Sequence, residues 1–246
     1  MPKLTDGMST LVTSNNYHFT AANIEDLGAA EYTLVTLACD VSSSVDRFRD
    51  QLEACIKTVL ESCRRSPRSQ NLLLRLCAFS SGLKELHGFR ELDGIRRSDY
   101  DQIIKTGGFT ALFDAGFEAV DATARYGKAL MERDYEVNGL VFIITDGMDN
   151  QSKRKPEHIS QLITKIRRSE MLENIDTVLI GVTSSGSVSA YLERFRKQAG
   201  LGHYIAMGEA SEKSLARLAG FMSRSIALKS QALGSGTAGN VIPIKI

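Results

Sequence analysis

Along this chain, short apolar runs alternate with stretches in which apolar residues recur every three or four positions. The run from Thr33 to Cys39 is almost continuously apolar, which is typical of a central β-strand covered on both faces. Apolar residues between Val45 and Cys63 recur at helical spacing, which predicts an amphipathic helix that ends before Pro67. The pattern therefore opens with a strand followed by a helix.

The same unit then recurs along the chain. Further strands are predicted over 71–79, 140–145, 176–182 and 203–207, a short strand or hairpin near 83–89, and helices over 111–126, from 156, around 188–195 and from 211. Strands that alternate with helices predict an α/β fold: a doubly wound, mostly parallel central sheet with helices on both faces.

We expect one domain with two appendages. Residues 1–30 are rich in Thr, Asn, Ser and Gly and have weak periodicity, so they are predicted to form an extended or loosely attached arm. Residues 31–228 contain the strand and helix pattern and form the predicted domain. Residues 229–246 include Gly234, Gly236 and Gly239 and are predicted to be a flexible tail.

Composition narrows the class of protein. The chain has 43% hydrophobic and 24% charged residues, as globular proteins do, and a net charge of +1 gives no overall attraction to nucleic acid or to an anionic membrane. No apolar run reaches the roughly 18 residues of a membrane span, and the first 16 residues lack the features of a signal peptide. We therefore expect a cytoplasmic protein.

Cysteine and histidine do not form a recognisable site. Cys39, Cys55, Cys63 and Cys77 lie in apolar patterns without a CxxC pair, which indicates buried thiols in a reducing compartment. The histidines, His18, His87, His158 and His203, share no metal-ligand spacing and are interpreted as ordinary polar or capping residues.

Hard oxygen ligands follow the predicted strands. Asp40, Ser42 and Ser44 come directly after the first strand, Asp146 follows the strand that ends at 145, and Thr110 follows two glycines before a helix. Ligands bind beyond the carboxyl ends of the strands in sheets of this kind. Two carboxylates with hydroxyl groups suit Mg²⁺ first, and Mn²⁺ or Ca²⁺ next.

This arrangement resembles the von Willebrand factor A (vWA) domain and its metal-ion-dependent adhesion site (MIDAS). The matching segments are DVSSS, GGFTALFDA and FIITDGMDN, and the resemblance covers about Tyr32 to Ala227. It implies that Asp40, Ser42, Ser44, Thr110 and Asp146 hold the metal, and that a partner protein presents Asp or Glu to it. The chain looks more like cytosolic bacterial or phage members than like secreted adhesion receptors, and this resemblance implies either a MoxR-type AAA+ ATPase as partner or a role in a stress or conflict system.

Simpler interpretations exist for each segment. Asp and Ser are common helix caps, Thr110 could cap the following helix, and Thr-Asp-Gly is a frequent turn. The first loop also departs from the usual DxSGS, because Ser43 replaces a glycine. Asp149 and Asn150 lie near the same edge and are either supporting groups or ordinary turn residues.

Two other functions compete with a binding module. A Mg²⁺-dependent hydrolase or phosphoryl-transfer enzyme would use the same crevice, but Ser42 stands where a haloacid dehalogenase-type phosphatase needs its second Asp, and no GxxxxGK[ST], GxSxG or GxGxxG motif follows a strand. We therefore expect no enzyme. RNA binding would need a basic surface, and the basic clusters are scattered over 64–68, 96–97, 153–155 and 167–168. Only 153–155 follows the Asp146 loop, where it could steer an acidic partner.

Overall fold

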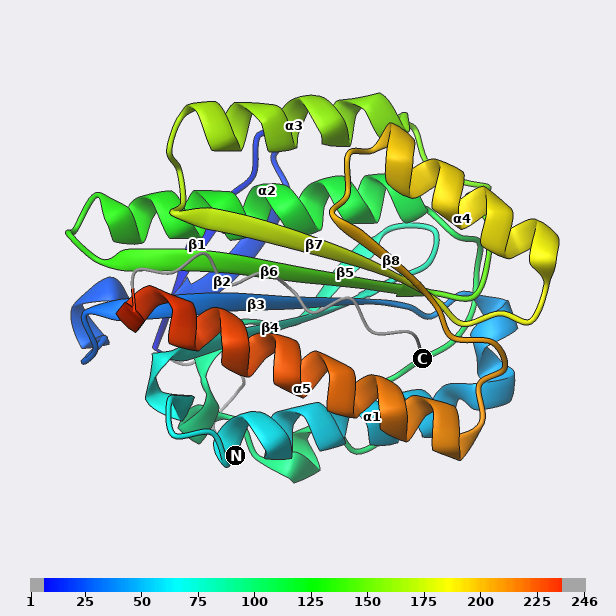
Figure 1. The fold of residues 1–246 in the computed structure, drawn as a ribbon, viewed down its shortest axis with the longest axis horizontal. Coiled ribbons are helices and arrows are strands. Elements are labelled where there is room, and N and C mark those ends of the chain that lie inside the picture. Colours follow the sequence, from blue (N-terminus) through cyan, green and yellow to red (C-terminus); the bar gives the residue numbers. More distant parts are fainter. Residues whose placement is uncertain (1–6, 236–246) are drawn as a thin grey trace.

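The structure, a computed structural model, describes residues 7–235 and consists of one eight-stranded sheet between two layers of helices (Figure 1). The strand order is β1-β2-β5-β4-β3-β6-β7-β8. The strands are β1 (Met8–Val12), β2 (His18–Ala22), β3 (Glu31–Asp40), β4 (Leu72–Phe79), β5 (Leu83–Glu91), β6 (Glu136–Thr145), β7 (Asn174–Gly181) and β8 (His203–Ala206). The doubly wound α/β class is confirmed.

The centre of the sheet is parallel. β3 pairs in parallel with β4 on one side and β6 on the other, and β6, β7 and β8 continue in the same direction. Every residue from Tyr32 to Asp40 is buried, as is every residue from Val137 to Thr145. This burial on both faces explains why these two runs lack the alternation of a half-exposed strand.

The helices form one layer on each face of the sheet. They are α1 (Arg49–Arg64), α2 (Leu112–Met131), α3 (Pro156–Arg168), α4 (Gly186–Gln198) and α5 (Glu212–Ser235). α1 and α5 pack with one face in a core that includes Leu37 and Phe142, while α2, α3 and α4 pack on the other face around Leu34 and Val141 (Figure 1). Alternate residues of the central strands therefore supply two separate cores.

In place of the predicted arm, the N-terminal residues form a hairpin of the sheet. β1 and β2 are antiparallel, and β2 extends the sheet beside β5. Phe19 and Ala21 of β2 are buried, and the Phe19 ring meets Phe89 edge to face at 6.3 Å. The strand approaches so closely that a β-carbon at Gly88 would lie 1.8 Å from the Thr20 carbonyl oxygen. The buried side chains of Phe19 and Ala21 and the close contact at Gly88 thus hold the N-terminal hairpin against β5.

The C-terminal boundary also differs from the prediction. α5 continues through 229–235 in place of the expected tail, and Lys229 is buried with its ammonium group 2.6 Å from Asp176 Oδ2. Ser230 is buried as well, and its hydroxyl accepts a hydrogen bond from Arg68. The rest of the predicted tail lies outside the described residues. Within 7–235, no helix is both long enough and apolar enough to cross a membrane.

Candidate metal centre

The two candidate carboxylates meet because their strands are neighbours. Asp40 is the last residue of β3, and Asp146 directly follows the last residue of β6. The register pairs Cys39 with Ile144, so the two parallel strands end at the same level. β3 and β6 are therefore adjacent parallel strands at the centre of the sheet.

The Asp40 carboxylate is only 1% exposed and is fixed by two hydrogen bonds. Its Oδ1 accepts from the Ser42 backbone N–H at 2.8 Å, and its Oδ2 accepts from the Thr145 hydroxyl at 2.6 Å. Burial raises the pKa of Asp40 to about 6, against the lowering effect of the bonds from Thr145 and Ser42, and the Asp146 charge raises it further. A bound cation would compensate a buried carboxylate of this kind.

The serine hydroxyls join the first loop to Asp146. Ser44 Oγ donates to Asp146 Oδ1 at 2.8 Å and lies 3.2 Å from Ser42 Oγ. The second carboxylate oxygen, Asp146 Oδ2, accepts from the Arg47 guanidinium at 3.2 Å. The Arg47 side chain is 68% exposed, so it reaches this carboxylate from the solvent side. Asp146 therefore already attracts a positive charge.

Thr110 lies on a loop that is tied to the Asp146 loop. Its backbone N–H donates to Asn150 Oδ1 at 2.7 Å, and its carbonyl accepts from the Asn150 N–H at 3.0 Å. A β-carbon placed on Gly147 would lie 4.0 Å from Thr110 Oγ1, so this hydroxyl is beside the turn that follows Asp146. The structure thus brings all five predicted residues to one edge of the sheet.

The alternative that Ser42 and Thr110 are simple helix caps does not hold in the structure. Ser42 precedes the first helical turn but makes no side-chain capping bond, and Thr110 does not cap α2. The first free N–H groups of α2 are bound instead by Asp149 and Ser152, since Phe113 N–H donates to both side chains. Asp149 and Asn150 therefore hold the loops and the helix in place.

The turn alternative does not account for Asp146 either. The Gly147 N–H in this turn donates to the Thr145 hydroxyl at 3.2 Å, so threonine supplies the turn contact. The carboxylate of Asp146 contacts the groups of the first loop, Ser44 and Arg47, and not its own backbone.

Ser43 fits the first loop without strain. It opens a short 3-10 helix, Ser43–Phe48, and its φ is not positive. Its N–H and hydroxyl both donate to the Gly108 carbonyl, at 3.3 and 3.2 Å. Positive φ occurs instead at Gly107 and Gly108, with 146° and 83°. The serine that replaces glycine thus adds a bond between the first and second loops.

The donor set fits a hard divalent cation. Two carboxylates balance the charge of such an ion, and hydroxyl oxygens fill further coordination positions. Mg²⁺ and Ca²⁺ both take oxygen ligands of these kinds. In the part of the chain that the structure describes, no three His, Cys, Asp or Glu side chains gather into a metal-binding group. An ion at this edge would therefore be held by Asp40 and Asp146 together with hydroxyl groups.

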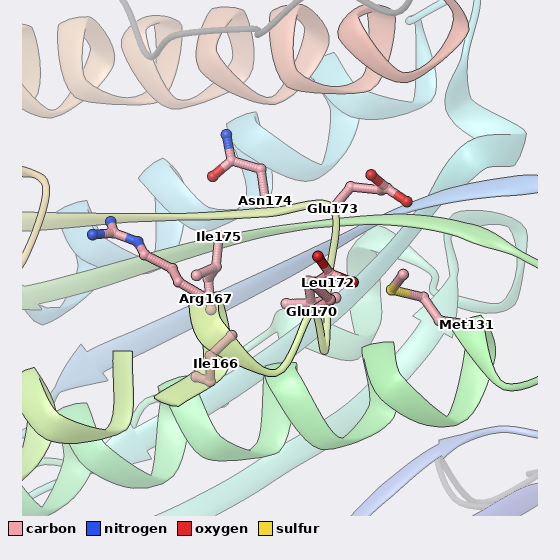
Figure 2. Close-up of a pocket in the computed structure, with 8 residues that line it drawn as sticks. All are labelled: Met131, Ile166, Arg167, Glu170, Leu172, Glu173, Asn174 and Ile175. Atoms are coloured by element: carbon pink, nitrogen blue, oxygen red, sulfur yellow. The ribbon is translucent and has the colours of Figure 1, made fainter. Parts of the chain in front are cut away.

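A hollow of about 470 Å³, drawn in close-up in Figure 2, lies at the amino end of β7, which is the opposite edge of the sheet from Asp40 and Asp146. It is formed where α3 ends and β7 begins, and Arg167, Glu170 and Glu173 line it beside Leu172 and Ile175. It lies at the amino ends of the strands, away from the five residues above, and contains no nucleophile beside a base. We therefore place the candidate function at the carboxyl edge.

The basic clusters are largely neutralised by neighbouring acids. Arg68 pairs with Glu31, and Arg96 with Asp99. Arg154, within the predicted steering segment 153–155, lies 4.0 Å above the Phe117 ring and pairs with acidic side chains of α2. Lys153 and Lys155 are exposed on the loop after Asp146.

Comparison with known proteins supports the fold. No protein-family model matches the chain, and a comparison with curated proteins finds no match. Among solved structures, the PilB minor pilin from Streptococcus sanguinis aligns with a TM-score of 0.59 at 14% identity, over 85% of this chain and 64% of that one. Proximal thread matrix protein 1 from the mussel byssus, solved with a zinc-occupied MIDAS motif, aligns at 0.55 and 19%, over 82% and 47%.

The ArnB paralog VWA2 from Sulfolobus acidocaldarius aligns with a TM-score of 0.50 at 14% identity, over 80% of this chain and 46% of that one. The chain has a vWA-like fold. At these identities the likeness is one of fold, and the chain spans less than two thirds of each of these three proteins.

Two supporting residues were not identified from the sequence: Thr145, whose hydroxyl donates to Asp40, and Arg47, whose guanidinium donates to Asp146. Asn150 was considered as a supporting group or a turn residue, and it makes reciprocal hydrogen bonds with Thr110. Thr145 is the last residue of a predicted strand, and Arg47 falls within the predicted helix between Val45 and Cys63. Only the position of Thr145, next to Asp146 in sequence, gave any signal of its role.

Proposed function

We propose that this chain is a metal-dependent protein-interaction module, an adaptor that binds an acidic residue of a partner through a Mg²⁺-type ion. The ion would be held by Asp40, Ser42, Ser44, Thr110 and Asp146. The observation that carries the proposal is the convergence of these hydroxyl and carboxylate groups from three separate loops at one edge of a vWA-like sheet. Mn²⁺ and Ca²⁺ are the next candidates, because they prefer the same oxygen ligands.

The chain's own groups leave the ion able to bind an outside carboxylate. Only two of the five donors are anionic, so they neutralise a divalent ion without reversing its charge. Octahedral Mg²⁺ takes six oxygen ligands, and five protein groups leave room for another. An incoming Asp or Glu meets this ion together with the exposed Arg47, and Lys153 and Lys155 steer it there.

We favour binding over catalysis because of the groups that surround the centre. They are carboxylates, hydroxyls and one guanidinium, while the four histidines lie on β2, β5, α3 and β8 and not on these loops. The four cysteines are buried and unpaired, which supports action in the reducing cytoplasm. Following the sequence resemblance, the first partner to test is a MoxR-type AAA+ ATPase, in a bacterial or phage stress or conflict system.

The direct test is Mn²⁺ binding, followed by electron paramagnetic resonance. We expect the wild type to bind Mn²⁺ and Mg²⁺ to displace it, and Asp146→Asn to lose binding. Asp46→Asn is the matched control, because Asp46 is an exposed carboxylate of the first loop, in the 3-10 helix Ser43–Phe48, that accepts a hydrogen bond from Thr106 and contacts none of the five ligands. Equal loss in both variants, or no Mn²⁺ binding by the wild type, would refute the metal site.

The partner-binding step is tested separately. EDTA and Thr110→Ala should each weaken the complex with the MoxR-type ATPase, or with whichever acidic protein binds. Binding that survives both changes would place the interaction elsewhere on the molecule.

A further inference from the structure

Large apolar side chains are exposed at three places in residues 7–235: Val12, Phe109 and Met148. Two of the three adjoin the metal centre in sequence. Phe109 directly precedes Thr110, and Met148 is the second residue after Asp146. Phe109 is 60% exposed and Met148 is 38% exposed. Exposed apolar side chains that gather beside a polar site indicate an interaction surface.

The two apolar residues lie on loops that are bonded to each other. The reciprocal bonds between Thr110 and Asn150 join the residue after Phe109 to the second residue after Met148. The Phe109 N–H also donates to Ser81 Oγ at 3.1 Å, which fixes the backbone beneath the ring. The ring is therefore held at the surface by an ordered backbone.

Arg47 adds an exposed charge to the centre. Its guanidinium lies against Asp146 and lines a small hollow of about 220 Å³ with Phe48, Val182, Ser184, Glu209 and Ala210. The loops around the centre thus carry exposed apolar side chains, Phe109 and Met148, as well as the charge of Arg47. A partner with a single acidic group and a polar surface would leave these apolar side chains uncovered.

We propose that the partner presents its acidic residue in an exposed segment with a large apolar side chain next to the acid, and that this side chain packs on Phe109 and Met148. This inference rests on the proposed metal-dependent binding, and it specifies the residues of the partner that the site recognises: an acidic residue with a large apolar neighbour. An aromatic ring supplies a large contact area for little conformational entropy, and methionine adapts to the shape of its neighbour. The two residues therefore suit an apolar anchor beside the metal-bound carboxylate.

The test is selection of random peptides displayed on phage by the full chain with Mg²⁺, followed by elution with EDTA. We expect eluted peptides to contain Asp or Glu with Leu, Ile, Phe or Met at a neighbouring position. Selection by Phe109→Ser should keep the acidic residue and lose the apolar one. Val12→Ser is the matched control, since Val12 is 37% exposed on β1 at the far end of the strand order, and should select the same peptides as the wild type.

The outcomes separate this inference from the function on which it rests. Acidic peptides without apolar neighbours would overturn the apolar anchor and leave metal-dependent binding standing. No peptides released by EDTA would refute metal-dependent binding, and the anchor with it.

Affinities give a second measurement. The selected peptide should bind Phe109→Ser about tenfold more weakly than the wild type, and Val12→Ser within about twofold. Mn²⁺ affinity should be unchanged in both variants. A parallel loss of Mn²⁺ affinity in Phe109→Ser would show that Phe109 acts through the metal loop, which would overturn its role as a peptide contact.

Discussion

Replacing Asp40 by asparagine should stabilise the protein without metal and destabilise it, relative to the wild type, with metal. Burial raises the pKa of Asp40 from 3.8 to about 6. Because the folded pKa is the higher one, the stability associated with this group is present below pH 3.8 and is lost as the pH rises through about 6. Above that range the folded protein carries the full cost of an ionised buried carboxylate.

The size of the effect follows from the same pKa change. The difference between 3.8 and about 6 corresponds to about 3 kcal/mol of unfolding free energy at neutral pH. Asparagine removes this charge but replaces one accepting oxygen by an amide nitrogen. It therefore loses one of the bonds from Ser42 and Thr145, at a cost of about 1 kcal/mol. In EDTA, Asp40→Asn should be more stable than the wild type by roughly 1–2 kcal/mol.

Metal should reverse this order. An ion at 100 times its dissociation constant stabilises the folded wild type by about 2.7 kcal/mol, whereas the asparagine variant should gain little. The assay is urea unfolding at pH 7.5 of both proteins, in EDTA and in saturating Mg²⁺. The reasoning is refuted if the variant is less stable than the wild type in EDTA, or if Mg²⁺ stabilises the two proteins equally.

Three further predictions concern single contacts. Arg47→Ala should raise Mn²⁺ affinity about two- to fivefold, because it removes a solvent-exposed cation that competes for Asp146; weaker Mn²⁺ binding would contradict this. Burial lowers the pKa of His87 to about 4. The unfolding free energy present above pH 6.5 should therefore fall by up to about 3 kcal/mol as the pH drops toward 4. Urea unfolding should show a flatter pH profile of the unfolding free energy for His87→Gln, and an equally steep profile would count against this role of His87. Gly88→Ala should cost about 2 kcal/mol or more and speed amide exchange in β2, because its methyl group meets the Thr20 carbonyl; unchanged exchange would argue against the docked hairpin.

The central strands and the edge of the sheet that carries the candidate metal centre could be predicted because they depend on local patterns. The run ending at Asp40 and the run ending at Thr145 are apolar on both faces, and that property alone indicates buried parallel strands. Once both strands lie in one parallel sheet, the residues that follow them must meet at its carboxyl edge. The apolar pattern thus places Asp40 and Asp146 at the same edge of the sheet, and their position side by side was predicted from the resemblance to the MIDAS, in which both hold one metal.

The N-terminal hairpin escaped prediction because its stability is tertiary. β2 buries only Phe19 and Ala21 at alternate positions, and its polar neighbour Thr20 is held by Glu85 of β5. Arg75 shows the same limit. It is fully buried within the apolar run of β4, where it pairs with Glu85 and has its guanidinium 5.6 Å from the centre of the Phe19 ring. Thr20 lies 65 residues from Glu85 in sequence, and Phe19 is likewise distant from Arg75, so the local pattern does not reveal these contacts.

The second loop is better held than its composition suggests. Two glycines before Thr110 indicate freedom of movement, yet Gly107 N–H donates to the Val41 carbonyl at 2.8 Å, and the Gly108 carbonyl accepts from Ser43. The N–H groups of Phe109 and Thr110 are bound by Ser81 and Asn150. Each residue from 107 to 110 is thus fixed by a neighbouring loop, and the glycines serve to reach positive φ.

A loop held in this way changes the expected energetics of partner binding. Ordering a flexible loop on association would consume part of the binding free energy, and a loop already in place avoids that cost. Phe109 and Thr110 are consecutive, so the apolar contact and the metal-side hydroxyl are positioned by the same set of backbone bonds. A partner therefore meets Phe109 and Thr110 already in place, and it can make the apolar contact and the contact at the metal together without a loop-ordering cost.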